Sequence, residues 1–253
     1  MSVKSLAAIG GVCAVCCGSA LAQSAAEPLS RAARPVVVEM FLSQSCSQSP
    51  PAADVVTALA ARPDVVALTW HVDYWDSVPA HKVGPWADPF ARPDFGARQI
   101  AYNSRIKGRA AKLTPQAVID GFISVAGGRR DAVEQRILEA QFYDEKAHAT
   151  PPVLEIDAAR DGIIRTRIEN VGAPYDAVMV SFSPKATTQV AAGDNAGLTF
   201  REANVVRAVH LIAKDQSGAG AFSFKAPAQD LDCAVLVHER NTGRVVAARY
   251  CED

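Results

Sequence analysis

The sequence predicts an α/β domain followed by an all-β, sandwich-like domain. In residues 35–149, segments typical of buried strands alternate with segments typical of helices. In residues 150–253, short β-rich runs recur between Gly, Pro and Asn residues, which is typical of a β-sandwich. Thr150-Pro151-Pro152 separates the two regions and indicates a domain boundary.

The composition is that of a folded globular protein. Of the 253 residues, 49% are hydrophobic and 21% are charged, which argues against disorder. There are 26 basic and 27 acidic residues, and the formal net charge is -1. This balance provides no general basic surface, so we expect no nucleic-acid partner.

Residues 1–22 are predicted to be a signal peptide. Lys4 supplies a positive start, Leu6–Cys17 supplies an apolar middle, and an Ala-x-Ala cleavage site lies at 20–22. Residues 23–34 are small and polar, as in a leader or a linker. We therefore expect a periplasmic or secreted protein with no stable membrane span after cleavage. A leader that is retained as an anchor is the alternative.

A strand, a helix and a second strand are predicted first along the α/β region. Val36–Phe41 is short, apolar and rich in β-branched residues, as in a buried strand. Pro50-Pro51 suits a first helical turn, and the helical pattern stops before Pro63. Val65–Trp70 is the second buried strand. The three segments fit a right-handed βαβ unit.

A helix, a hairpin and a further helix are predicted next. The first of these helices presents four residues on one face: Phe95, Gln99, Tyr102 and Ile106. Asp120-Gly121 separates two short β-rich runs and indicates the hairpin. Asp131–Phe142 is the final helix of this region.

Seven short strands are predicted in the second region. They are Val153–Ile156, Ile163–Ile168, Ala177–Ser183, Val205–Ile212, Ala221–Phe224, Ala234–His238 and Val245–Tyr250.

The cysteines divide into a predicted pair and a single thiol. Cleavage of the leader leaves three of the six, and an odd count in an exported chain indicates one disulfide and one free thiol. Cys233 and Cys251 are equally distant from Thr242, which lies in a turn between the last two strands. The simplest hairpin therefore places them opposite each other, and we predict a structural disulfide between them. A redox-active pair is the alternative.

Cys46 lies between the first predicted strand and the first predicted helix. There, the helix dipole and free backbone N–H groups stabilise a thiolate, which is the reactive form of cysteine. Ser49 follows at the Cys-x-x-Ser spacing, where a dithiol site would have a second cysteine. The alternative is that Cys46 is a packed core residue.

Two residues at the end of the second strand are candidates for acid/base chemistry. The C-terminal ends of parallel strands meet at one edge of a sheet, so we expect His71 and Asp73 near Cys46. The alternative is that His71 is a packed strand residue. The imidazole and acidic side chains of this region are His71, Asp73, Asp76 and His81. Their spacing matches no firm metal-ligand pattern, so we expect no metal.

Thr114-Pro115 stands just before a predicted strand. An X-Pro bond in such a place is a candidate for a cis peptide. The alternative is an ordinary loop proline in the trans form.

These residues together resemble a bacterial domain-of-unknown-function family of exported thioredoxin-like proteins. The matching residues are Val38-Glu39-Met40-Phe41, Ser43-Gln44, Cys46, Pro50-Pro51-Ala52, His71-Val72-Asp73-Tyr74-Trp75-Asp76, Asp88-Pro89-Phe90, Arg98-Gln99, Tyr102, Thr114-Pro115-Gln116, Gly193-Asp194-Asn195 and Asn204-Val205-Val206-Arg207. The resemblance implies a thioredoxin-like domain followed by a β-rich one, and a thiol–disulfide role.

The chain departs from the family pattern in the cysteine loop. The family usually has a second cysteine where Ser49 stands and a glycine where Ser45 stands. Pro115 occupies the position of the cis proline in thioredoxin-type members. A hydroxyl cannot form a disulfide, so Ser49 cannot resolve a mixed disulfide on Cys46 as a second cysteine would. Three outcomes remain. An external thiol resolves the mixed disulfide on Cys46, or Cys233 or Cys251 resolves it, or Cys46 has lost redox activity.

Two functions follow from this pattern. In the first, Cys46 is the nucleophile of a monothiol redox or thiol-binding protein, Ser49 donates a hydrogen bond to its thiolate, and Pro115 shapes a peptide-binding edge. Its partner would be a thiol-containing protein or a small thiol. In the second, the protein is a non-enzymatic envelope binding or scaffold protein, and Cys46 is packing. No Gly-x-Ser-x-Gly, P-loop or zinc-protease pattern is present, which argues against a hydrolase, and we expect no cofactor.

Overall fold

The computed structural model describes the chain apart from residues 2–33, 79–83, 148–149 and 252–253. Except for Met1 and Arg34, the predicted signal peptide and leader lie outside the described residues, and so does His81. Within the described part, no helix has the length and apolar character needed to cross a membrane.

The strands of the described residues form two sheets. The strands of the larger sheet are β1 (Val36–Leu42), β2 (Val65–His71), β3 (Gln116–Ile119), β4 (Ile123–Ala126), β7 (Tyr175–Gln189), β8 (Thr199–Gln216), β10 (Asp232–Glu239) and β11 (Val245–Tyr250). They lie in the order β11-β10-β7-β8-β2-β1-β3-β4. The smaller sheet has the order β5-β6-β9 and contains β5 (Val153–Arg160), β6 (Ile163–Glu169) and β9 (Gly220–Lys225).

The helices are α1 (Pro50–Leu59), α2 (Pro93–Lys107) and α3 (Arg130–Ala147), and a 3₁₀ turn, η1 (Asp73–Trp75), follows β2. The predicted strand–helix–strand unit is confirmed, because β1 and β2 are parallel and α1 connects them. All residues of both strands are buried, which explains their continuous apolar sequence.

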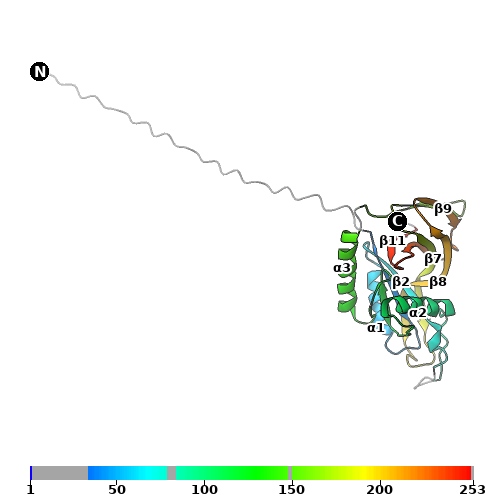
Figure 1. Ribbon diagram of the computed structural model, residues 1–253. Coiled ribbons are helices and arrows are strands. Elements are labelled where there is room, and N and C mark those ends of the chain that lie inside the picture. The colour runs from blue at the N-terminus through cyan, green and yellow to red at the C-terminus, as the bar shows by residue number, and fades with distance from the viewer. Residues whose placement is uncertain (2–33, 79–83, 148–149, 252–253) are drawn as a thin grey trace. The chain divides into compact units, whose positions relative to one another are not determined.

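Successive side chains of β1 point to opposite faces of the larger sheet, and each face has its own helices. Met40 packs in one apolar cluster with Val56 of α1 and Ile137 of α3. Phe41 packs in a second cluster with Phe95 of α2. The sheet is therefore covered by α1 and α3 on one face and by α2 on the other (Figure 1).

The predicted fold class is wrong. The protein is mostly β, and it is not a thioredoxin-like α/β domain followed by a separate sandwich. Four strands of the second region, β7, β8, β10 and β11, continue the sheet that β1–β4 begin. The junction is the parallel pairing of Thr69 in β2 with Val205 in β8. Without β8, the apolar strand β2 would have an open edge of unpaired backbone groups. β8 pairs with this edge at Thr69, and the side chains of Tyr250 and Asn204 bond the backbone N–H and carbonyl of Ala67. The segment limits drawn at 22, 34 and 149 stay predictions.

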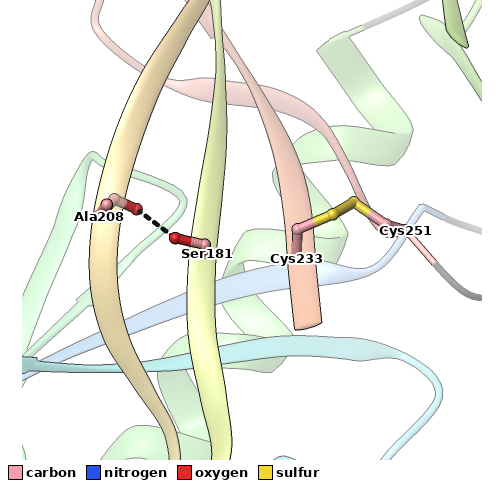
Figure 2. Close-up of a disulfide and its surroundings, with 4 residues drawn as sticks. All are labelled: Ser181, Ala208, Cys233 and Cys251. Atoms are coloured by element: carbon pink, nitrogen blue, oxygen red, sulfur yellow. Dashed lines mark hydrogen bonds between the residues drawn. A yellow bond between two sulfur atoms is a disulfide. The ribbon is translucent and has the colours of Figure 1, made fainter. Parts of the chain in front are cut away.

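The Cys233–Cys251 disulfide is confirmed. Its sulfur atoms are 2.01 Å apart and join β10 to the residue after β11 (Figure 2). Near the turn the register shifts at a bulge beside Val237, and beyond the bulge Ala234 faces Tyr250. The bulge brings the strands into the register in which the two cysteines are opposite, with Cα atoms 5.3 Å apart. Both cysteines are buried among apolar side chains from both sheets.

Candidate functional site

Cys46 lies in the loop between β1 and α1, beneath the surface. Its backbone N–H donates to the Ser43 carbonyl at 3.1 Å, and its own carbonyl accepts from the Ser49 N–H at 3.0 Å. The loop thus consists of two consecutive tight turns. The Ser49 hydroxyl accepts the Ser43 N–H at 3.3 Å, and Ser49 is the N-cap residue of α1. Only 2% of the Cys46 surface is exposed.

The Cys46 sulfur faces the segment that contains Thr114 and Pro115. Its Sγ is 3.8 Å from the Thr114 carbonyl oxygen, which is a thiol-to-carbonyl hydrogen bond. The Thr114–Pro115 peptide is cis, as predicted. The Trp75 indole N–H donates to the Thr114 hydroxyl at 2.6 Å, so η1 holds this segment from the other side. The structure therefore brings Cys46 and Pro115 into one neighbourhood, with Thr114 between them.

Tyr74 supplies a neutral phenol beside the same segment. Its hydroxyl donates to the Gln99 side-chain oxygen at 3.1 Å. Burial raises the pKa of Tyr74 well above its ordinary range, and negative charge at Cys46 acts in the same direction. The phenol therefore keeps its proton at physiological pH and remains a hydrogen-bond donor.

His71 lies in a fully buried charged triad. Its Nδ1 is 2.7 Å from Asp88 Oδ2, and its Nε2 is 3.2 Å from Glu202 Oε1. The second contact is an ion-pair distance, but the two groups are not aligned as a hydrogen bond. All three side chains have no exposed surface.

His71 and Asp88 form an ion pair at neutral pH, and Glu202 lies on the other side of the imidazole. Burial lowers the pKa of the His71 imidazole, but the charges of Glu202 and Asp88 outweigh burial and raise this pKa to about 10. Burial acts to raise the pKa of Asp88, and the positive charge and hydrogen bond of His71 lower it overall. His71 is therefore an imidazolium with no free lone pair. The acid/base roles predicted for His71 and Asp73 stay predictions.

Gln44 joins this triad to the Cys46 loop. Its backbone N–H donates to Asp88 Oδ2 at 2.8 Å, and its side-chain Nε2 donates to Glu202 Oε2 at 2.9 Å. The same Nε2 donates to the Thr188 hydroxyl at 3.1 Å, and Oε1 accepts from the Trp86 indole at 3.2 Å. One loop residue thus contacts both carboxylates that flank His71.

Asn195 holds the backbone of the Cys46 loop through its side-chain amide. Its side-chain Nδ2 donates to the Gln44 carbonyl at 2.8 Å and to the Cys46 carbonyl at 2.9 Å. The Ser45 hydroxyl donates to the Trp86 carbonyl at 2.8 Å. The backbone around the thiol is therefore tied to segments from both halves of the chain.

Asp73 lies apart from these contacts. Asp73 is the first residue of η1. Its side chain packs closely against Gly96 of α2, because a Cβ atom added to Gly96 would lie only 2.9 Å from Asp73 Oδ1. Asp76 accepts the Asp88 N–H at 3.3 Å, and burial raises the pKa of Asp76. In the part of the chain that the structure describes, no group of three or more His, Cys, Asp or Glu side chains has the arrangement of a metal site.

A second buried polar cluster lies on the opposite face of β1. Arg98 donates to both oxygens of Glu39, at 2.6 and 3.0 Å, and Tyr102 also donates to Glu39. Arg98 is 3.0 Å from the Nε2 atom of His238. Burial, together with the charges of Arg98 and Arg105, lowers the pKa of His238 well below its ordinary value. His238 is therefore neutral, and this cluster is separate from the Cys46 loop.

Sequence reasoning did not assign Gln44, Asp88, Asn195 or Glu202 to the site. Asp88 and Glu202 are 17 and 131 positions from His71, and no local pattern connects them. A usable signal did exist for Glu39, because a charged residue in the middle of a buried apolar strand requires a buried partner.

The fold and site define a class of protein: a mixed-sheet protein with a buried thiol in a strand–helix loop that lies next to a cis proline and is hydrogen-bonded through Gln44 to a charged triad. The chain belongs to the family described as protein of unknown function (DUF1223), whose model matches residues 37–238.

Two solved structures are similar to this chain in fold. Protein AGR_C_4864 from Agrobacterium tumefaciens has a TM-score of 0.71 and 23% sequence identity, and the match covers 87% of this chain and 95% of that chain. HBP35 of Porphyromonas gingivalis has a TM-score of 0.57 and 16% identity, and the match covers 86% of this chain and 74% of that chain. At these identities the likeness concerns the fold alone. A comparison with curated proteins found no match.

Proposed function

We propose that this is an exported, periplasmic or secreted protein that uses Cys46 as a single thiol in thiol–disulfide exchange or thiol binding. The observation that carries the proposal is the position of Cys46. Cys46 is the free cysteine of the residues that the structure describes, and it lies near the start of α1. Its sulfur contacts the carbonyl of Thr114, the residue before the cis proline Pro115. The N-terminus of a helix favours a thiolate.

The reaction is a disulfide exchange with an external partner. The Cys46 thiolate attacks one sulfur of a partner disulfide, forms a mixed disulfide, and releases the other sulfur as a thiolate. A second external thiolate then attacks the mixed disulfide and regenerates Cys46. Each step breaks one S–S bond and forms one, so electrons balance without a further oxidant. Cys233 and Cys251 are already bonded to each other, which supports an external thiol as the resolving group.

Ser49 and Pro115 would support this chemistry. The Ser49 hydroxyl accepts one hydrogen bond from Ser43, so its own proton is available to turn toward a sulfur anion on Cys46. Pro115 would contribute to the surface against which a partner chain lies. In this proposal His71 supports the loop through its contacts with Asp88 and Glu202.

Incubation of the folded full-length protein with oxidised glutathione tests the proposal. Peptide mapping by mass spectrometry separates Cys46 from the leader cysteines and from the disulfide pair. We expect a glutathionyl group on Cys46, removable with reductant, and none at this peptide in Cys46→Ser. If Cys46 stays unmodified in the folded protein, the result contradicts the proposal.

The burial of Cys46 favours a second function, that of a non-enzymatic envelope binding or scaffold protein. A thiol that is 2% exposed and hydrogen-bonded to a carbonyl resembles a packed core residue. Under this alternative, Cys46→Ser leaves the partner set and the cellular phenotype unchanged. Recovery of a mixed disulfide through Cys46 from the cell envelope would count against it.

A further inference from the structure

We propose that Gln44 is a positioning residue for Cys46, and that the buried triad of Asp88, His71 and Glu202 holds the thiol loop closed through it. This inference rests on the proposed function, because it explains how access to the reacting sulfur is controlled. In this inference, the hydrogen bonds of Gln44 limit the movement of the loop that exposes the Cys46 sulfur. The exchange chemistry alone does not require such a residue.

The hydrogen bonds of Gln44 connect the Cys46 loop to the triad. Its backbone N–H and its side-chain Nε2 reach Asp88 and Glu202, which are the two carboxylates that flank His71. It is fully buried, two residues before Cys46, and its carbonyl accepts from Asn195. Hydrogen bonds to ionised buried carboxylates are stronger than those between neutral groups.

The triad supplies this hold without approaching the sulfur. Glu202 comes from β8 and Asp88 from the segment before α2, so Gln44 ties the loop to two separate elements. The His71 imidazolium lowers the pKa of Asp88 and lies between the Asp88 and Glu202 side chains, which are the two acceptors of Gln44. Because Cys46 is almost entirely buried, a partner can reach its sulfur only when the loop moves, and the Gln44 contacts oppose that movement.

Two substitutions of Gln44 separate positioning from general destabilisation. Gln44→Ala removes the side-chain donors and leaves Glu202 and Trp86 without their Gln44 partner. Gln44→Glu keeps the shape but places a carboxylate against Glu202. Protonation of that new carboxylate restores a donor, so its effect depends on pH, whereas the effect of alanine does not.

The measurement is the alkylation rate of Cys46 by iodoacetamide in the folded full-length protein, followed on the Cys46 peptide. Expressed as the ratio of variant to wild type at each pH, the rate is free of the pH dependence of thiol alkylation that the two proteins share. We expect Gln44→Ala to react about tenfold faster at every pH, because unpaired buried polar groups weaken the closed loop. For Gln44→Glu we expect a ratio near one in acid that rises with pH, with a midpoint above the ordinary glutamate value of about 4.3.

Thr166→Ala is the control. Thr166 is a buried residue of β6 in the smaller sheet, and its hydroxyl donates to the Glu155 carbonyl. Its loss should lower global stability and leave Cys46 alkylation within about twofold of wild type. Equal acceleration in Thr166→Ala, or a Gln44→Glu ratio that does not change with pH, would overturn the inference. If Gln44→Ala accelerates alkylation but no variant exchanges with oxidised glutathione, the positioning role stands and the proposed exchange fails.

Discussion

The charge balance beneath the Cys46 loop depends on the buried imidazolium of His71. Two carboxylates face it, from Asp88 and Glu202, and none of the three side chains reaches solvent. A buried charge without its partner is strongly unfavourable, so the triad is stable only as a unit. The triad supports Cys46 indirectly, because Asp88 and Glu202 accept hydrogen bonds from Gln44 in the Cys46 loop.

Replacing His71 by glutamine should therefore destabilise the protein. His71→Gln leaves two buried carboxylates without a cation, and we expect a loss of about 3–5 kcal/mol in the free energy of unfolding at pH 7. Urea denaturation measures it. The control is His210→Gln on the exposed face of β8, for which we expect a change within about 0.5 kcal/mol.

The pH dependence of that difference gives its cause. The pKa of His71 is raised from 6.5 to about 10 on folding, so its ionic contribution is fully present below pH 6.5. The contribution declines above that pH and is lost as the pH rises through about 10. The stability gap between wild type and His71→Gln should shrink over this window. A gap that stays constant would show that packing, rather than charge, holds His71.

Elements whose signals are local were predicted well. The apolar run at β1, the Pro-Pro start of α1 and the turn before β11 each depend on neighbouring residues. The Cys233–Cys251 pairing also followed from one hairpin, although a bulge contributes to its register. The pairing of β8 with β2 was missed, because no local pattern shows which strand closes the edge of another. Glu202 lies on β8, so the triad was missed for the same reason.

The turn at the start of α1 predicts a gain of function in Ser49→Cys. The Ser49 N–H donates to the Cys46 carbonyl at 3.0 Å, which places the two Cα atoms within about 7 Å. That separation is compatible with a disulfide. We expect oxidised glutathione to yield a bond between Cys46 and the new thiol, with no lasting glutathione adduct. Non-reducing peptide mapping detects this bond.

Ser104→Cys is the control for this gain of function. Ser104 lies on the exposed surface of α2, where its hydroxyl donates to the Ile100 carbonyl, so its new thiol is not joined to Cys46 by the turn that contains Ser49. That variant should retain the glutathione adduct on Cys46. If Ser49→Cys retains it as well, the loop does not have the turn geometry described.

At the scale of the whole molecule, one sheet spans both regions of the sequence. β8 and β7 belong to the second region, yet they continue the strand order from β2. The triad and the Asn195 contacts cross the same junction. The Cys46 loop is consequently assembled only when both regions are folded together.

This arrangement predicts a single cooperative unfolding transition. The three tryptophans are Trp70, Trp75 and Trp86, so fluorescence follows the first region, while far-UV circular dichroism follows the strands of both. We expect the two signals to have coincident urea midpoints. Two separate midpoints would indicate that the regions fold independently and would contradict the shared sheet as a cooperative unit.

The exchange equilibrium of Cys46 tests directly whether its thiol takes part in disulfide exchange. The folded protein is equilibrated in buffers of varied reduced-to-oxidised glutathione ratio, and the fraction of Cys46 carried as the mixed disulfide is quantified by peptide mapping. We expect a reversible, saturable modification at Cys46 that follows this ratio, with the Cys233–Cys251 bond intact. A Cys46 that remains a free thiol at every ratio until urea unfolds the protein would contradict the proposed exchange.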